Sequence, residues 1–162
     1  MKLRCEKFIK GLHYEATGLG GRWKYRSLRK TIVYFDSKLV SKPVRCFDKS
    51  GRHWGTIRPF SIEINQNYAW NGSSCSPDAE WNMLASMIHD FLFQFSGAIN
   101  FPLEITLSVA NNMFYSLCSA QGGKYPGVIY RIGLFAGSYF SWRTTPKDGE
   151  YCVTFNPKEE TI

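Results

Sequence analysis

The chain has 162 residues, of which 44% are hydrophobic and 16% aromatic. This length suits one domain with a hydrophobic core, and the aromatic content argues against an intrinsically disordered protein. The formal net charge is +7, made of +11 over residues 1–60, −2 over 61–145 and −2 over 146–162. The basic first part favours an anionic partner, such as nucleic acid, an anionic nucleotide or an acidic membrane, with a solvated basic surface as the alternative.

Predicted strands dominate the first 70 residues. Residues 31–35 and 39–40 are short β-type runs, and Asp48 to Gly51 carry a turn signal. The run 54–64 alternates in places, and its Pro59 either confines it to an edge or splits it. Residues 22–30 interleave aromatic and cationic side chains, which suits stacking on bases and equally suits an ordinary amphipathic strand or loop.

Three helices are predicted next, over residues 77–95, 102–120 and 126–142. Pro77 suits a first helical turn, and glycines follow the first two segments. The short connection between the first two helices favours an antiparallel pair. With a final short strand over 151–155, we expect a single α+β domain over residues 1–162. Its basic, β-rich part (1–70) packs on a helical part (77–142), followed by a short strand and tail (143–162).

The sequence indicates a reducing setting and no membrane span. The five cysteines are widely spaced and contain no CxxC pair, so a zinc site is not supported and reduced thiols are expected. No secretory signal peptide is visible at the start of the chain. The longest apolar run, residues 128–142, is shorter than the ~20 residues that a transmembrane helix needs.

An imidazole and a carboxylate, His89 and Asp90, lie side by side in the apolar first helix. Burying either group costs free energy unless it finds a partner. We expect Asp90 to accept hydrogen bonds from backbone N–H groups of the loop 71–74. We expect His89 to form a hydrogen bond with Asn111, Asn112 or a carbonyl group. The pair then serves as a structural polar cluster, a catalytic dyad or a ligand site. The residues that accompany it as candidate binding residues are Asn71, Gly72, Ser74, Asn111 and Arg131.

Three runs, residues 68–77, 85–95 and 110–114, resemble a phage and prophage family, domain of unknown function 1353. The family has a similar order of an amide- or acid-Gly-Ser loop, a His-Asp helix and a helix with Ala-Asp-x-x-Phe. Asn71 and Asn111 stand where the family often has acids. The resemblance covers about residues 55–142 and implies a bacteriophage protein of the host cytoplasm or the virion. It favours a virion or tail accessory or interaction protein, with phage or host proteins as partners.

The layout is also similar, more distantly, to phospholipase A2, which places a His-Asp pair on one of two antiparallel helices behind a Gly-containing loop. This likeness implies His89 as general base and Asp90 as a calcium ligand beside the carbonyl groups around Gly72. An amide at Asn111 stabilises a charged imidazole less than a carboxylate does. A His-dependent esterase or phospholipase is therefore the second expectation, and a nucleic-acid or anionic-nucleotide binder is the third.

Overall fold

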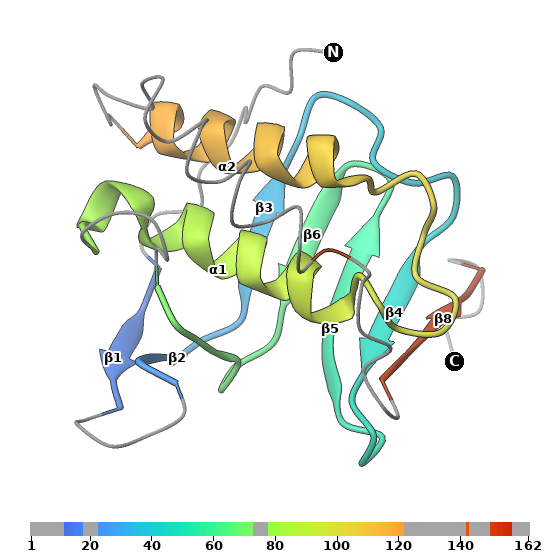
Figure 1. The fold of residues 1–162 in the computed structure, drawn as a ribbon, viewed down its shortest axis with the longest axis horizontal. Helices are drawn as coiled ribbons and strands as arrows, with labels where there is room; N and C mark the ends of the chain where they lie inside the picture. Colours follow the sequence, from blue (N-terminus) through green and yellow to red (C-terminus); the bar gives the residue numbers. More distant parts are fainter. Residues whose placement is uncertain (1–11, 18–22, 73–77, 122–141, 143–149, 157–162) are drawn as a thin grey trace.

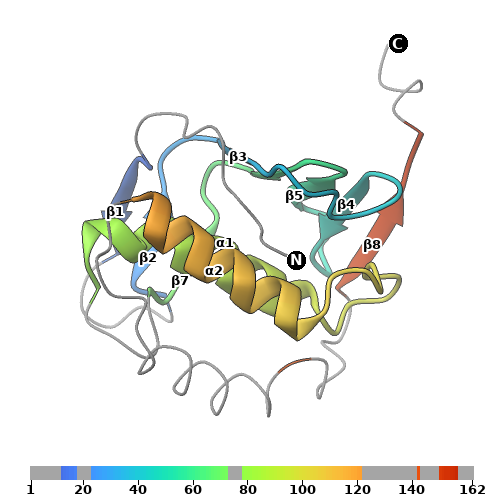
Figure 2. The ribbon, with the colours of Figure 1, turned by 90° about the horizontal axis from the view of Figure 1, so that it is seen from above.

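The computed structural model describes residues 12–17, 23–72, 78–121, 142 and 150–156. Within them, two antiparallel sheets lie on one side of a pair of helices (Figures 1 and 2). A β-rich first part packed on a helical second part confirms the predicted α+β class. The third predicted helix, residues 126–142, lies outside the described residues except for Trp142.

The larger sheet has the strand order β3-β6-β5-β4-β8, with every neighbouring pair antiparallel. Pro59 and Phe60 form the turn of the β5–β6 hairpin, so Pro59 splits the predicted run, and β5 is central rather than at an edge. Gly51, at φ +80°, ends the predicted turn before β5. Residues 39–40 are not a strand but part of a buried connection. The strands are β3 (Thr31–Tyr34), β4 (Val44–Phe47), β5 (His53–Arg58), β6 (Ser61–Ile64) and β8 (Tyr151–Thr154).

The smaller sheet has the order β1-β2-β7, formed by β1 (Tyr14–Ala16), β2 (Tyr25–Ser27) and β7 (Ala69–Trp70). The ring of Tyr25 packs against Tyr14 and Trp70, at centroid distances of 5.5 Å and 5.6 Å. Arg26 forms an ion pair with Glu15 across the strands. In the described part of the run 22–30, these contacts favour the strand interpretation over a base-stacking surface.

The helices α1 (Glu80–Phe95) and α2 (Leu107–Ala120) run antiparallel and pack against each other, as predicted (Figure 1). Both begin later than predicted. Asn82 Oδ1 accepts from the Ala79 N–H at 3.0 Å, which starts α1 after Asp78. The predicted start of α2 at Pro102 is wrong, because residues 102–105 form a turn and Thr106 caps the helix by accepting from Val109 N–H.

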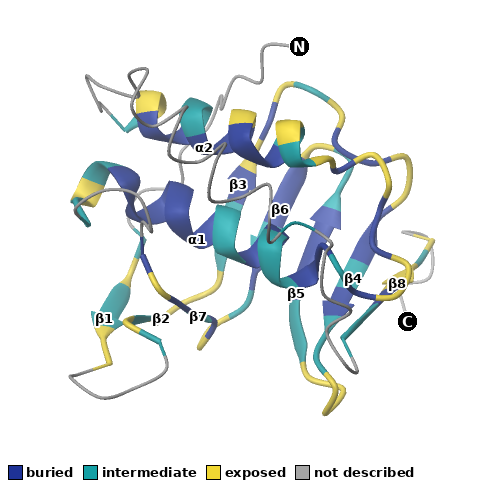
Figure 3. Cartoon of the chain, in the orientation of Figure 1, coloured by how far each residue is buried: buried dark blue, intermediate teal, exposed yellow. Residues whose placement is uncertain are grey.

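A single hydrophobic core lies between the helices and the larger sheet, as the buried inward surfaces in Figure 3 show. Gly55 on β5 lies where the sheet approaches α1 closely, because a Cβ there would lie 2.9 Å from the Phe91 ring of α1. The same Cβ would lie 2.4 Å from the Glu63 carbonyl oxygen of β6. The face of the sheet that meets α1 is called the inner face below. In the described part of the chain, no helix has the length and hydropathy that crossing a membrane requires.

Candidate functional site

His89 lies on the side of α1 that meets α2, and its Nε2 is 3.1 Å from Oδ1 of Asn111. An amide oxygen only accepts hydrogen bonds, so Nε2 carries the proton and Nδ1 carries the lone pair of a neutral ring. The imidazole packs against the rings of Phe93 and Phe114, at centroid distances of 4.4 Å and 5.5 Å. The predicted contact between His89 and Asn111 is therefore confirmed.

Desolvation among these rings lowers the pKa of His89 to about 4, from an ordinary value of 6.5, and the Asn111 hydrogen bond offsets this only in part. The side chain is therefore neutral at pH 7. A base that activates water works best when its pKa lies near the working pH. Because a neutral amide stands at Asn111, the charged form of the ring receives little compensation. The geometry suits a neutral imidazole that joins two helices better than a general base.

Asp90 faces the other way, toward the loop that leads into α1. Its Oδ2 accepts a hydrogen bond from the Asn71 N–H at 3.1 Å, so the predicted contact between Asp90 and this loop is also confirmed. Tyr68, just before β7, is buried, and both burial and the nearby Asp90 carboxylate raise the pKa of its hydroxyl. The Asp90 hydrogen bond therefore links α1 to the backbone directly after β7.

Gly72, next to Asn71 in this loop, has a constrained backbone. Its φ of +76° lies in the left-handed region, and a Cβ there would lie 2.4 Å from Oδ1 of Asp78. Asp78 accepts a hydrogen bond from the Tyr25 hydroxyl at 2.8 Å and lies 3.8 Å from Lys24 Nζ. The Asp78 carboxylate therefore links the residues just before α1 to β2.

The remaining predicted site residues, Ser74 and Arg131, lie outside the described residues. Within the described ranges, no group of three or more His, Cys, Asp or Glu side chains is placed to hold a metal ion. Calcium at Asp90 therefore stays a prediction. Of the other histidines, His13 is exposed. His53 is not a free surface residue, because its ring contacts Gly55 O, Thr56 Oγ1 and Asn65 Nδ2.

The face of the larger sheet opposite the inner face, called the outer face below, carries a second group of polar and aromatic side chains. Strand alternation and the register place there Ile32, Tyr34, Arg45, Phe47, His53, Thr56, Arg58, Ser61, Glu63, Tyr151 and Val153, with Phe155 following on the same side. Among the described elements, both helices lie on the inner face, and none lies over the outer face (Figure 2).

Two arginines and three aromatic rings lie together on the part of this outer face that β5, β4 and β8 form. The Arg45 guanidinium lies 4.2 Å from the centroid of the Phe155 ring, and that of Arg58 lies 5.7 Å from it. Beside them, Phe47 and Tyr151 stack at 5.1 Å with their planes 10° apart. Sequence reasoning missed this group. The alternation of Val44-Arg-Cys-Phe47 was the available signal, but the pairing of β8 with β4 joins segments that are about 100 residues apart.

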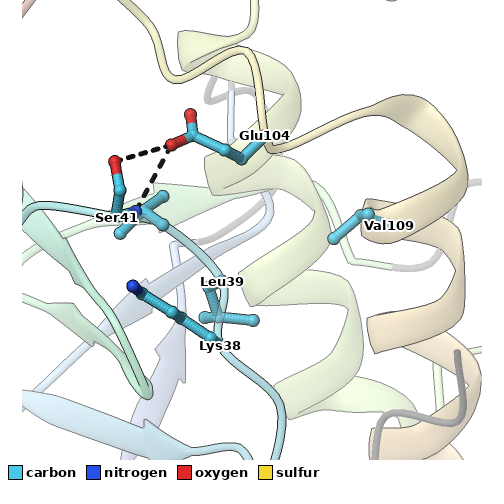
Figure 4. A pocket seen from close by; sticks show the side chains of 6 residues that line it. Lys38, Leu39, Ser41, Glu104 and Val109 are labelled. Atoms are coloured by element: carbon cyan, nitrogen blue, oxygen red, sulfur yellow. Dashed lines mark hydrogen bonds between the residues drawn. The ribbon is translucent and has the colours of Figure 1, made fainter.

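A separate cavity of about 350 Å³ lies between the β3–β4 connection and α2 (Figure 4). Glu104 Oε1 accepts hydrogen bonds from the Ser41 hydroxyl at 2.9 Å and from its N–H at 3.3 Å. Val109 on α2 faces the loop that carries Lys38 and Leu39 (Figure 4). The cavity shares no residue with the His89 contacts, and its hydrogen bonds fasten the loop to the connection before α2.

No protein-family model, curated protein or solved structure matches this chain. The resemblance to the phage family, the virion or tail role and the location that it implies therefore stay predictions.

Proposed function

We propose that this chain is a binding protein that takes single-stranded nucleic acid on the outer face of its five-stranded sheet. In this proposal the His89 and Asp90 contacts have a structural role: they hold α1 to α2 and to the loop 71–72. The observation that carries the proposal is the placement of Arg45 and Arg58 around the Phe155 ring on a sheet face that no described helix covers.

The chemistry of this face suits a single strand. Unpaired bases expose their flat surfaces, and each base stacked on an aromatic side chain contributes ~1–3 kcal/mol to binding. Phe47 and Tyr151, on the adjacent strands β4 and β8, and Phe155, directly after β8, are partly exposed rings. A guanidinium that lies over a ring keeps N–H groups at its edge, and these are suited to phosphate oxygens. The face therefore offers both of the interactions that bind single strands without reading sequence.

The charge distribution supports an anionic ligand. Fifteen Lys and Arg residues against four Asp and Glu fall within residues 1–60, the part of the chain that supplies β1 to β5 and most of the outer face. Glu63, an acid on the same face, forms an ion pair with Lys30 at 2.8 Å, which offsets its charge locally. A cationic surface with aromatic rings favours a phosphate backbone over a neutral ligand.

The hydrolase interpretation is not favoured by the same structure. Its two layout contacts, His89 with Asn111 and Asp90 with Asn71, are present. However, the imidazole with a pKa of about 4 is a weak base, and its N–H is directed at a neutral amide. Nucleic-acid binding on the outer face does not depend on the protonation state of His89.

The experiment is a fluorescence anisotropy titration of a labelled oligothymidine of about 15 nucleotides, close to the length that such surfaces cover. Phe155→Ala is expected to weaken binding by roughly 5–150-fold, the equivalent of one lost stacking contact. Removing Arg45 and Arg58 together is expected to lower the magnitude of the slope of log Kd against log salt by ~1.4. Lys38→Ala, a control that removes one charge beside the cavity near α2, leaves the affinity within about twofold.

Three outcomes would contradict the proposal. The first is no binding by the wild-type protein at low salt. The second is binding that does not weaken as salt is added. The third is an equal effect of Lys38→Ala and Phe155→Ala, which would place the strand elsewhere on the protein. Thermal unfolding of each variant shows that the variant is folded at the assay temperature.

A further inference from the structure

Two of the three described cysteines lie directly opposite each other in the larger sheet. Cys46 on β4 pairs with Cys152 on β8, and their Sγ atoms are 3.7 Å apart. Both side chains point to the inner face and are buried, at 0% and 1% exposure. Cys118, on α2, has no part in this pair. Both thiols are reduced in this structure.

The position of the pair in the hydrogen-bond ladder decides whether the sulfur atoms can join. Phe155 N–H donates to Pro43 O at 3.1 Å, which makes that pair a hydrogen-bonded one. Hydrogen-bonded and non-hydrogen-bonded pairs alternate along an antiparallel ladder, so the cysteines three positions further occupy a non-hydrogen-bonded pair. In agreement, the Cys152 N–H points away from β4 and donates to Ile99 O at 2.8 Å.

Non-hydrogen-bonded pairs bring opposed Cα atoms to ~4.5 Å, and disulfides span Cα distances of ~4.4–6.8 Å. The backbone therefore already has a spacing that a disulfide accepts. The Sγ–Sγ distance of 3.7 Å shortens to that of a covalent bond by rotation of the two side chains, without movement of either strand.

We propose that Cys46 and Cys152 are a modification site, at which a small-molecule disulfide such as oxidised glutathione converts the two thiols to an intramolecular disulfide. One protein thiolate attacks a glutathione sulfur, breaks its S–S bond and releases one reduced glutathione, leaving a mixed disulfide. The second protein thiolate then attacks the protein sulfur of that mixed disulfide and releases the second glutathione. Two protein thiols are oxidised and one glutathione disulfide is reduced, so electrons and protons balance.

Because both thiols are buried, a small-molecule disulfide reaches them only when β8, the four-residue terminal strand of the sheet, separates from β4. Burial raises the pKa of the Cys46 thiol well above its ordinary value, so the thiolate forms mainly when β8 separates. Oxidation is therefore slow in the native protein. Once formed, the bond joins segments 106 residues apart and holds β8, with Tyr151 and Val153 on its outer side, to β4. The inference stands without the nucleic-acid proposal, because it uses only the inner-face pair.

The test is to incubate the folded full-length chain with oxidised glutathione at mildly alkaline pH without denaturant. Digestion without reductant, followed by mass spectrometry, is expected to find one cross-linked peptide pair that contains Cys46 and Cys152. The oxidised protein is expected to have a Tm roughly 5–15 °C higher than the reduced one, because the cross-link restricts the unfolded chain. Adding a dithiol reductant reverses the shift.

Two variants make the assignment specific. A chain with Cys5, Cys75 and Cys118 replaced by Ala keeps only the opposed pair and is expected to show the full shift. Cys152→Ala in that background removes the shift. Glutathione bound to single cysteines without a cross-link, a cross-link through another cysteine, or a bond that forms only above the unfolding midpoint in urea would each overturn the proposal. Peptide mapping of the wild-type chain decides the matter even if a variant fails to fold.

Discussion

Replacing His89 with Gln separates the titration of this residue from its hydrogen bond. A Gln side chain keeps an N–H that is able to reach Oδ1 of Asn111, but it has no group that gains a proton in the acidic range. The variant therefore tests whether a neutral, desolvated imidazole makes the protein sensitive to acid.

The magnitude follows from the two pKa values. The folded protein holds His89 at a pKa of about 4, below its ordinary value of 6.5. Between these pH values the unfolded chain binds a proton that the folded chain does not, so the stability falls as the pH drops from about 6.5 to about 4. The difference of 2.5 pKa units, at ~1.36 kcal/mol per unit, gives at most about 3 kcal/mol from this one group. Above pH 6.5 this contribution is constant.

The assay is urea unfolding of the wild type and His89→Gln, followed by tryptophan fluorescence, at several pH values from 4 to 7. At pH 7 the variant is expected to be less stable, by about 1–2 kcal/mol, through poorer packing against Phe93 and Phe114. The gap narrows or reverses toward pH 4, because only the wild type carries the His89 penalty. His13 and His53 are present in both proteins and cancel in the difference. Parallel curves over the whole range would refute the reasoning.

Further predictions concern the packing, the loop and the reaction. Gly55→Ala is expected to lower the free energy of unfolding by about 1–3 kcal/mol in urea titrations, because the added Cβ meets the Glu63 carbonyl and the Phe91 ring. An unchanged free energy of unfolding would contradict this packing. Gly72→Ala is expected to cost about 1–3 kcal/mol through its positive φ, and a Tm equal to the wild type would show that the loop relaxes freely. With calcium present, the protein is expected to hydrolyse a chromogenic ester no faster than His89→Gln does, and a rate that depends on His89 would restore the hydrolase interpretation.

The sequence predicted what depends on local patterns. Apolar side chains at helical spacing located both described helices. Pro59 left two alternatives, an edge strand or a split run, and the structure has the split, at the β5–β6 turn. The His89 to Asn111 contact was also within reach, because two helices joined by a short connection lie side by side. The helix starts were misplaced, since Thr106, not the earlier Pro102, caps α2.

The outer face was beyond such reasoning because it is made by pairing of distant segments. Arg45 and Phe155 come together only because β8, which follows both helices in the sequence, pairs with β4. The same pairing opposes Cys46 and Cys152, which the sequence showed only as two widely spaced thiols. Strand order in a mixed domain follows from packing of whole elements, and single-strand alternation does not specify it.

Backbone amide mapping by NMR tests the central claim most directly. Titrating the isotope-labelled protein with an unlabelled oligothymidine is expected to shift the amide signals of Arg45, Thr56 and Val153, which lie on neighbouring strands of the outer face. The signals of Val109 and Asn112, on α2 at the other side of the sheet, are expected to stay in place. Shifts confined to α2, or no shifts at low salt, would contradict nucleic-acid binding on the outer face.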